Sequence, residues 1–211
     1  KEQEDFDGAD LILFNTCAIR ENAENHLYGE LGRAKETYLK NKDTIIAICG
    51  CVMQEEKAVR YVLDHFNFVS LIFGTNNITS FYSLLEDCLV HHEGIVDVKS
   101  NSDLIEEGFP EGKEGRESKV TAFVNIMYGC DKFCTYCIVP YTRGRERSRE
   151  VNSILNEIRD MRDKGFKEVT LLGQNVNSYL YEQDGERVNF SSLLEKVALE
   201  APQMRIRFVT S

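Results

Sequence analysis

Three closely spaced cysteines constrain this chain more than any other feature of its sequence. Cys130, Cys134 and Cys137 stand at CxxxCxxC spacing, directly after an apolar run at 121–127. Zinc sites usually take two pairs of ligands that complete a tetrahedron, and no fourth cysteine or histidine lies near this loop. Three thiolates in one tight loop suit a cubane iron–sulfur cluster better, with three irons held and the fourth left open. The loop therefore predicts a cluster whose free iron binds a ligand.

Other roles for these cysteines stay open on the residues alone. They could form a zinc knuckle with a remote fourth ligand, form disulfides, or hold the cluster of an electron-transfer iron–sulfur protein. No signal peptide opens the chain, and no apolar run approaches the roughly 20 residues that cross a bilayer. We therefore expect a cytoplasmic protein without a membrane partner, whose seven cysteines are reduced thiols or metal ligands.

Short apolar runs alternate with amphipathic segments along most of the chain. Apolar runs predict strands at 11–14, 44–48, 68–73, 121–127, 168–172 and 205–209. Apolar residues at helical spacing predict helices over 19–38, through 58–62, and over 78–89, 151–161 and 193–198. Such alternation is typical of α/β proteins with parallel sheets. We predict a doubly wound parallel-sheet domain at 1–98, a polar linker at 99–119, and the first half of a (βα) barrel, TIM-like but partial, at 120–211.

Two further cysteines follow strands of the first predicted domain. Cys17 and Cys51 each come after an apolar run, at the sheet edge where open α/β sheets bind ligands. Gly50 would let backbone approach a bulky group closely. Free cysteines are often simply buried, which is our interpretation of Cys88 and of Cys49, although Cys49 would face the same side as Cys51 in an extended strand. For Cys17 and Cys51 we predict a second cluster, whose third thiolate would have to come from a segment preceding this chain.

The chain is acidic overall but basic beside the three-cysteine loop. Lysine and arginine number 25 against 35 aspartate and glutamate, and this net charge of −10 alone argues against a nucleic-acid partner. The segment 143–149 nevertheless holds four arginines and one glutamate. Because guanidinium groups pair bidentately with phosphates or carboxylates, we expect Arg143, Arg145 or Arg147 to hold an RNA backbone or a cofactor carboxylate. A solvated helix start is the alternative.

One aromatic and two amide side chains complete the candidate site. Tyr136 directly precedes Cys137, and its ring could stack on a bound base; a packed loop aromatic is the alternative. Gln174 and Asn175 follow the predicted strand 168–172, where their amides could bond a ribose or a nucleobase edge. A polar loop without a ligand is the alternative for these two residues.

Four segments together resemble the methylthiotransferases, a family of radical S-adenosylmethionine (SAM) enzymes. They are Asn15-Thr16-Cys17, Gly50-Cys51-Val52-Met53-Gln54, the cysteine loop at 129–137 and the arginine segment at 143–149. They occur in the family's order and cover nearly the whole chain. Within the family, the segments 19–24 and 173–179 are similar to the tRNA-modifying branch called MiaB.

This resemblance implies a reaction and its cofactors. The cysteine loop would hold a [4Fe–4S] cluster that cleaves SAM to methionine and a 5′-deoxyadenosyl radical, with Tyr136, Gln174 and Asn175 beside SAM. The radical would abstract hydrogen from isopentenyladenosine next to the anticodon. An auxiliary [4Fe–4S] cluster at Cys17 and Cys51 would supply the sulfur, already methylated by another SAM, to give the 2-methylthio base.

The resemblance also implies partners and alternatives. The partners would be the tRNA anticodon stem-loop and a reductant protein of the flavodoxin or ferredoxin type. Other family members act on a ribosomal protein or on threonylcarbamoyl-adenosine in tRNA, and these remain alternative substrates. The family's first auxiliary-cluster cysteine and the second half of the barrel are absent here, so we expect this portion to be inactive alone.

Overall fold

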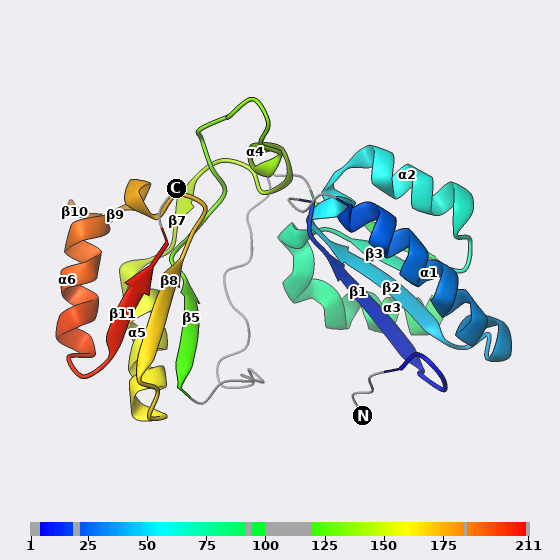
Figure 1. Ribbon diagram of the computed structural model, residues 1–211, viewed down its shortest axis with the longest axis horizontal. Coiled ribbons are helices and arrows are strands. Elements are labelled where there is room, and N and C mark those ends of the chain that lie inside the picture. The colour runs from blue at the N-terminus through cyan, green and yellow to red at the C-terminus, as the bar shows by residue number, and fades with distance from the viewer. Residues whose placement is uncertain (1–4, 19–21, 92–93, 100–119, 184, 210–211) are drawn as a thin grey trace. The chain divides into compact units, whose positions relative to one another are not determined.

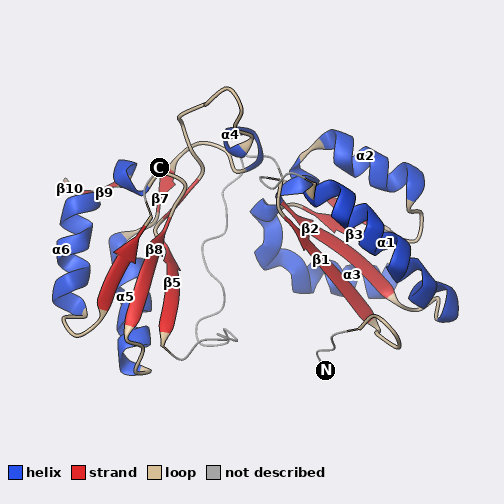
Figure 2. Ribbon diagram, in the orientation of Figure 1, coloured by secondary structure: helices blue, strands red, loops and turns tan. Residues whose placement is uncertain are grey.

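The computed structural model describes residues 5–18, 22–91, 94–99, 120–183 and 185–209 (Figures 1 and 2). It divides into two compact units. The first comprises Lys1–Phe109 together with Cys134–Arg143, and the second comprises Pro110–Phe133 together with Gly144–Ser211. All but one residue of the predicted linker at 99–119 lies outside the described residues, so the predicted domain boundaries stay predictions.

The first unit is built on a four-stranded parallel sheet in the order β1-β2-β3-β4. The strands are β1 (Leu11–Thr16), β2 (Ile45–Gly50), β3 (Leu71–Phe73) and β4 (Ile95–Asp97). The helices between them are α1 (Ala23–Lys40), α2 (Glu56–His65) and α3 (Phe81–His91), with short 3-10 turns at η1 (Cys51–Gln54) and η2 (Thr75–Ser80). Six of these elements, three strands and three helices, match those that the apolar spacing predicts: β1, β2, β3, α1, α2 and α3.

Helices cover both faces of this sheet. Ile46 and Ile48 of β2 pack with buried residues of α1 and α2 in one cluster. Ala47 and Cys49, which alternate with them, pack with Leu84 of α3 in another. This alternation is the period of two that a strand buried on both sides requires. The doubly wound arrangement predicted from the sequence is therefore confirmed (Figure 1).

The second unit contains a three-stranded parallel sheet in the order β11-β8-β5. The strands are β5 (Thr121–Asn125), β8 (Glu168–Leu172) and β11 (Arg205–Phe208), and the helices are α5 (Val151–Asp163) and α6 (Phe190–Glu200). Both helices share one core with the sheet (Figure 2), while the ring of Phe123 on β5 is exposed. Three parallel strands with helices over one face confirm the predicted partial barrel.

Shorter elements connect these strands. The predicted strand 121–127 is interrupted, because Met127–Tyr128 forms a separate strand, β6, that pairs with β7 (Arg147–Ser148). After β8 come a 3-10 turn, η3 (Val176–Ser178), and the hairpin of β9 (Leu180–Gln183) and β10 (Glu186–Asn189). Helix α4 (Val139–Thr142) lies in the segment grouped with the first unit. No helix in the described part of the chain is long and apolar enough to cross a membrane.

Candidate functional site

The two cysteines of the first unit leave the sheet at adjacent strand ends. Thr16, the last residue of β1, pairs with Gly50, the last residue of β2, and Cys17 and Cys51 follow them directly. Thr16 Oγ1 donates a hydrogen bond to the carbonyl of Cys49 at 3.0 Å. A Cβ on Gly50 would lie 2.1 Å from the Thr16 carbonyl oxygen, and Gly50 has φ +106°. Gly50 thus permits a close approach to the neighbouring strand β1, and this contact holds both cysteines at one sheet edge.

Cys51 is buried beside a guanidinium group of the same unit. The Nε–H of Arg143 donates to Cys51 Sγ at 3.4 Å, and Cys51 is 3% exposed. Arg143, predicted to hold RNA or a cofactor carboxylate, therefore lies beside a predicted cluster ligand.

The other two cysteines of this unit lie in the core. Burial, with a smaller contribution from the charge of Cys51, raises the pKa of the Cys49 thiol to about 11. Cys88 is also buried, which raises its pKa, and its Sγ–H donates to the Ser70 carbonyl at 3.6 Å. Raised pKa values keep both groups as neutral thiols at neutral pH. The burial predicted for Cys49 and Cys88 is confirmed.

The three-cysteine loop presents free thiols in three environments. Cys130 is buried, Cys137 is partly exposed and Cys134 is exposed. Cys130 is grouped with the second unit and the other two with the first, so no separation between the three is defined. Among the described residues, no three His, Cys, Asp or Glu side chains gather as a metal site. The fit to an iron–sulfur cluster rests on the donors themselves, three free thiols on one loop without helix or strand between Gly129 and Ile138.

The start of this loop is held by the arginine segment. Gly129 has φ +73°, and a Cβ there would lie 2.1 Å from the Arg145 carbonyl oxygen. The amide of Cys130 donates to the Gly144 carbonyl at 3.1 Å. The Arg145 guanidinium lies 4.8 Å from the Phe133 ring centre, a cation–π contact. Part of the arginine segment therefore shapes the cysteine loop itself.

The fourth arginine of the segment is structural. The side chain of Arg149 is 13% exposed and forms a 2.9 Å ion pair with Glu157. It also donates to the Asn125 carbonyl at 2.6 Å and to Ser153 Oγ at 2.9 Å, and its own carbonyl accepts a 2.7 Å hydrogen bond from the Tyr179 hydroxyl. Arg149 therefore ties the end of β5 to α5.

The predicted aromatic and amide residues differ in how accessible they are. The ring of Tyr136 is 91% exposed, as a stacking platform requires. Gln174 is partly exposed. Asn175 is 5% exposed, and its Nδ2 donates to Glu146 Oε1 at 3.0 Å. Cofactor binding by these three residues stays a prediction, and Asn175 already bonds within the protein.

Sequence reasoning missed Glu146, which contacts both the cysteine loop and the loop that follows β8. It is the one acidic residue in the segment 143–149, and that isolated negative charge is the signal that could have identified it.

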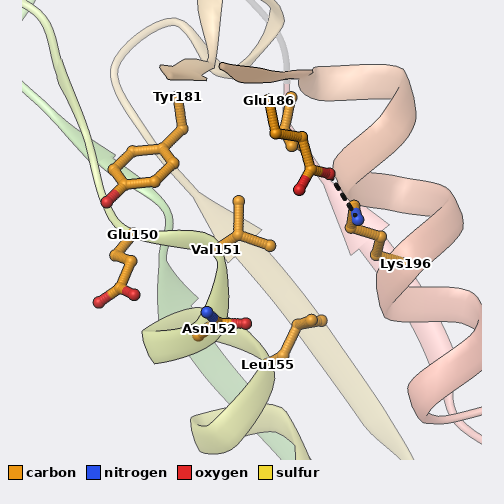
Figure 3. Close-up of a pocket in the computed structure, with 8 residues that line it drawn as sticks. Glu150, Val151, Asn152, Leu155, Tyr181, Glu186 and Lys196 are labelled. Carbon is orange, nitrogen blue, oxygen red and sulfur yellow. Dashed lines mark ion pairs between the residues drawn. The ribbon is translucent and has the colours of Figure 1, made fainter. Parts of the chain in front are cut away.

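One pocket lies apart from these residues (Figure 3). It has a volume of about 280 Å³ between the start of α5, the β9–β10 hairpin and α6. Tyr181 and Glu150 line it, as does a 3.0 Å ion pair between Lys196 and Glu186. None of the predicted site residues lines it, and its mixture of both charges indicates no particular ligand.

Comparisons with known proteins agree with this arrangement. The model of "Uncharacterized protein family UPF0004" matches residues 1–74, and that of the "Radical SAM superfamily" matches 124–211. Three curated proteins named tRNA-2-methylthio-N(6)-dimethylallyladenosine synthase are each 47% identical to the chain. The protein of Staphylococcus saprophyticus matches over 99% of this chain and 40% of its own length, that of Bacillus subtilis over 97% and 40%, and that of Clostridium tetani over 100% and 46%.

The chain thus spans less than half the length of the curated relatives it matches. The first family model lies within the predicted domain at 1–98. The second lies within the predicted domain at 120–211 and begins just before the three-cysteine loop. On this combination of domains and identity, the chain is similar over nearly its whole length to these tRNA-2-methylthio-N(6)-dimethylallyladenosine synthases, and its second half is similar to the radical SAM superfamily.

Proposed function

We propose that the protein containing this chain adds a methylthio group to N6-dimethylallyladenosine (isopentenyladenosine) in tRNA. The observation that carries the proposal is 47% identity over 99% of the chain to a synthase named for that product. The modified base would lie in the anticodon stem-loop, and the enzyme would act in the cytoplasm with a flavodoxin- or ferredoxin-type reductant.

The cysteines would divide between two clusters. Cys130, Cys134 and Cys137 would hold the radical SAM cluster, which when bound supplies the electron that cleaves SAM. Cys17 and Cys51 would hold the auxiliary cluster. The contact between Thr16 and Gly50 supports this pairing, because it keeps the two cysteines on adjacent strand ends.

The remaining site residues would bind and orient the substrates. The exposed ring of Tyr136 would stack on the adenine of SAM, and Gln174 and Asn175 would contact SAM through their amides. Of the arginines, Arg145 has a side chain that is 73% exposed and is the best placed for an RNA phosphate. Arg143 would act beside the auxiliary cluster through its contact with Cys51.

The proposal is tested with the full-length enzyme after anaerobic cluster reconstitution. It is incubated with SAM, a reductant and an anticodon stem-loop RNA carrying isopentenyladenosine, and the nucleosides are analysed by mass spectrometry. We expect the 2-methylthio nucleoside to form. Cys134→Ala should abolish it, whereas Cys88→Ala, which removes a thiol assigned to no cluster, should keep it.

Parallel reactions separate the alternatives. Product on a ribosomal protein, or on stem-loops carrying threonylcarbamoyl-adenosine but not isopentenyladenosine, would overturn the substrate assignment. A reduced cluster whose electron paramagnetic resonance (EPR) spectrum does not change on adding SAM would instead indicate an electron-transfer protein.

A further inference from the structure

We propose that Glu146 is a positioning residue that joins the start of the three-cysteine loop to the loop after β8. The inference deepens the proposed function and rests on it, because those two loops carry the predicted ligands of the cluster and of SAM. All the contacts that support it lie within the second unit.

The carboxylate of Glu146 holds the loop that follows β8. Its Oε1 accepts hydrogen bonds from Asn175 Nδ2 at 3.0 Å and from Ser178 Oγ at 2.7 Å. Asn175 is nearly buried, and its Nδ2 also contacts Ser178 Oγ. One carboxylate oxygen thus fixes both ends of the four-residue segment 175–178, which directly follows Gln174.

The backbone around Glu146 holds the cysteine loop. Its amide donates to Asp131 Oδ1 at 3.2 Å, and Arg145 Nη1 lies 3.5 Å from the same oxygen. Two residues before Glu146, the Gly144 carbonyl accepts the hydrogen bond from the Cys130 amide. A displacement of Glu146 would therefore move the backbone against which Cys130 is seated.

A second contact, between Gly173 and Met127, holds the same two loops together. A Cβ on Gly173 would lie 2.5 Å from Met127 Cγ, so the residue before Gln174 packs on a residue just before the cysteine loop. Gly173 and Met127 supply the apolar contact between the two loops, and the hydrogen-bonded contact between them depends on the acceptor oxygen of Glu146.

Ion pairing with Arg145 or Arg149 does not account for Glu146. In the described chain, the ion pairs of Arg145 and Arg149 go to Asp131 and Glu157. The contacts of the Glu146 carboxylate are instead to a neutral amide and a neutral hydroxyl. What these partners require is an acceptor oxygen in a fixed place, and Gln supplies one as well as Glu does.

This requirement defines the variants. Glu146→Ala removes the acceptor, whereas Glu146→Gln keeps it without the charge. Glu150→Ala is the matched control, because Glu150 lies four residues further along and lines the pocket of Figure 3. All three are made in the full-length enzyme and compared by hydrogen exchange with mass spectrometry, by SAM titration, and by EPR spectroscopy of the reduced cluster.

Glu146→Ala loses the hydrogen bonds that Asn175 and Ser178 donate to the Glu146 carboxylate. This loss should speed hydrogen exchange of the Cys130 amide about tenfold or more. The same variant should bind SAM more weakly and change the EPR response to SAM. Glu146→Gln should stay within about threefold of wild type in each measurement, and Glu150→Ala should match wild type.

The outcomes separate this inference from the function on which it rests. Normal exchange of the Cys130 amide in Glu146→Ala, or equal damage in the Gln and Ala variants, would overturn the positioning role. If the exchange results hold but SAM leaves the EPR spectrum of wild-type enzyme unchanged, the proposed function is wrong and the connection between the loops stands.

Discussion

Replacing Gly50 by alanine should disrupt the sheet edge that carries Cys17 and Cys51. Gly50 has φ +106° and ψ −175°, a region open almost only to glycine, and forcing another residue there costs about 1–3 kcal/mol. The new Cβ would also lie 2.1 Å from the Thr16 carbonyl oxygen, so Thr16 must move. Loss of the Thr16 hydrogen bond to Cys49 adds about 1 kcal/mol. The combined loss in the free energy of unfolding is about 2–4 kcal/mol.

Gly8→Ala provides the matched control. Gly8 also has a positive φ, +74°, but nothing lies within 4 Å of a Cβ built there. This variant should lose only about 1 kcal/mol, the conformational part of the effect. Comparing the two variants therefore isolates the collision with the neighbouring strand.

The assay is native-state hydrogen exchange of the β1 and β2 amides, because a protein with two units need not unfold in one step. A difference of about 2 kcal/mol between the variants corresponds to roughly 30-fold faster exchange in Gly50→Ala. If Gly50→Ala exchanges no faster than Gly8→Ala, the contact between the strand ends does not hold this edge together.

Three further predictions concern stability. Hydrogen bonds from Arg159 and Arg162 lower the pKa of Glu200, so this carboxylate stabilises the fold above its ordinary pKa of 4.5. Glu200→Gln should therefore lower the melting temperature at pH 7. Calorimetry should show that the difference from wild type shrinks below pH 4.5. Gly29 is exposed within α1 with open space around it, so Gly29→Ala should stabilise the protein by about 0.5–1 kcal/mol in urea unfolding; a loss would contradict the helix geometry. Arg149→Met removes the ion pair with the partly exposed Glu157 and should destabilise the second unit by about 2 kcal/mol, measured by hydrogen exchange of α5. A double variant with Glu157→Leu should recover part of this loss.

The long periodic elements of this fold could be predicted from the sequence. Strand β8 matches its predicted range, and β1, β2, α5 and α6 lie where the apolar spacing indicates. Their signal is strong because each buries a regular series of apolar residues. The segment 19–21 at the start of the predicted first helix lies outside the described residues.

Short and polar elements could not be predicted in this way. Strand β4 has three residues, and the β9–β10 hairpin carries mostly charged or polar side chains with Val188 buried. The break at Ile126 depends on pairing between β6 and β7, residues about twenty positions apart. Such pairing is decided by tertiary contacts that no local pattern contains.

The sequence predicts the kind of chemistry at the candidate site but not the burial of its residues. Spacing alone predicts cluster ligands at Cys130, Cys134 and Cys137, and position after a strand predicts Cys17 and Cys51, and both stay predictions. The arginines look equivalent in the sequence, yet the side chain of Arg149 is mostly covered and that of Arg145 is exposed. Burial separates a structural arginine from one available to a ligand, and burial comes from the packed structure.

The unequal exposure of the loop cysteines has a practical consequence for anyone handling this protein in air. Cys134 is exposed while Cys130 is buried, and thiol oxidation follows accessibility. In protein without the proposed cluster, oxidation should begin at Cys134 as a sulfenic acid, which a reductant can still reverse. The oxidation state of that single side chain, read by peptide mass spectrometry, would report how far a preparation has aged before its activity is assayed.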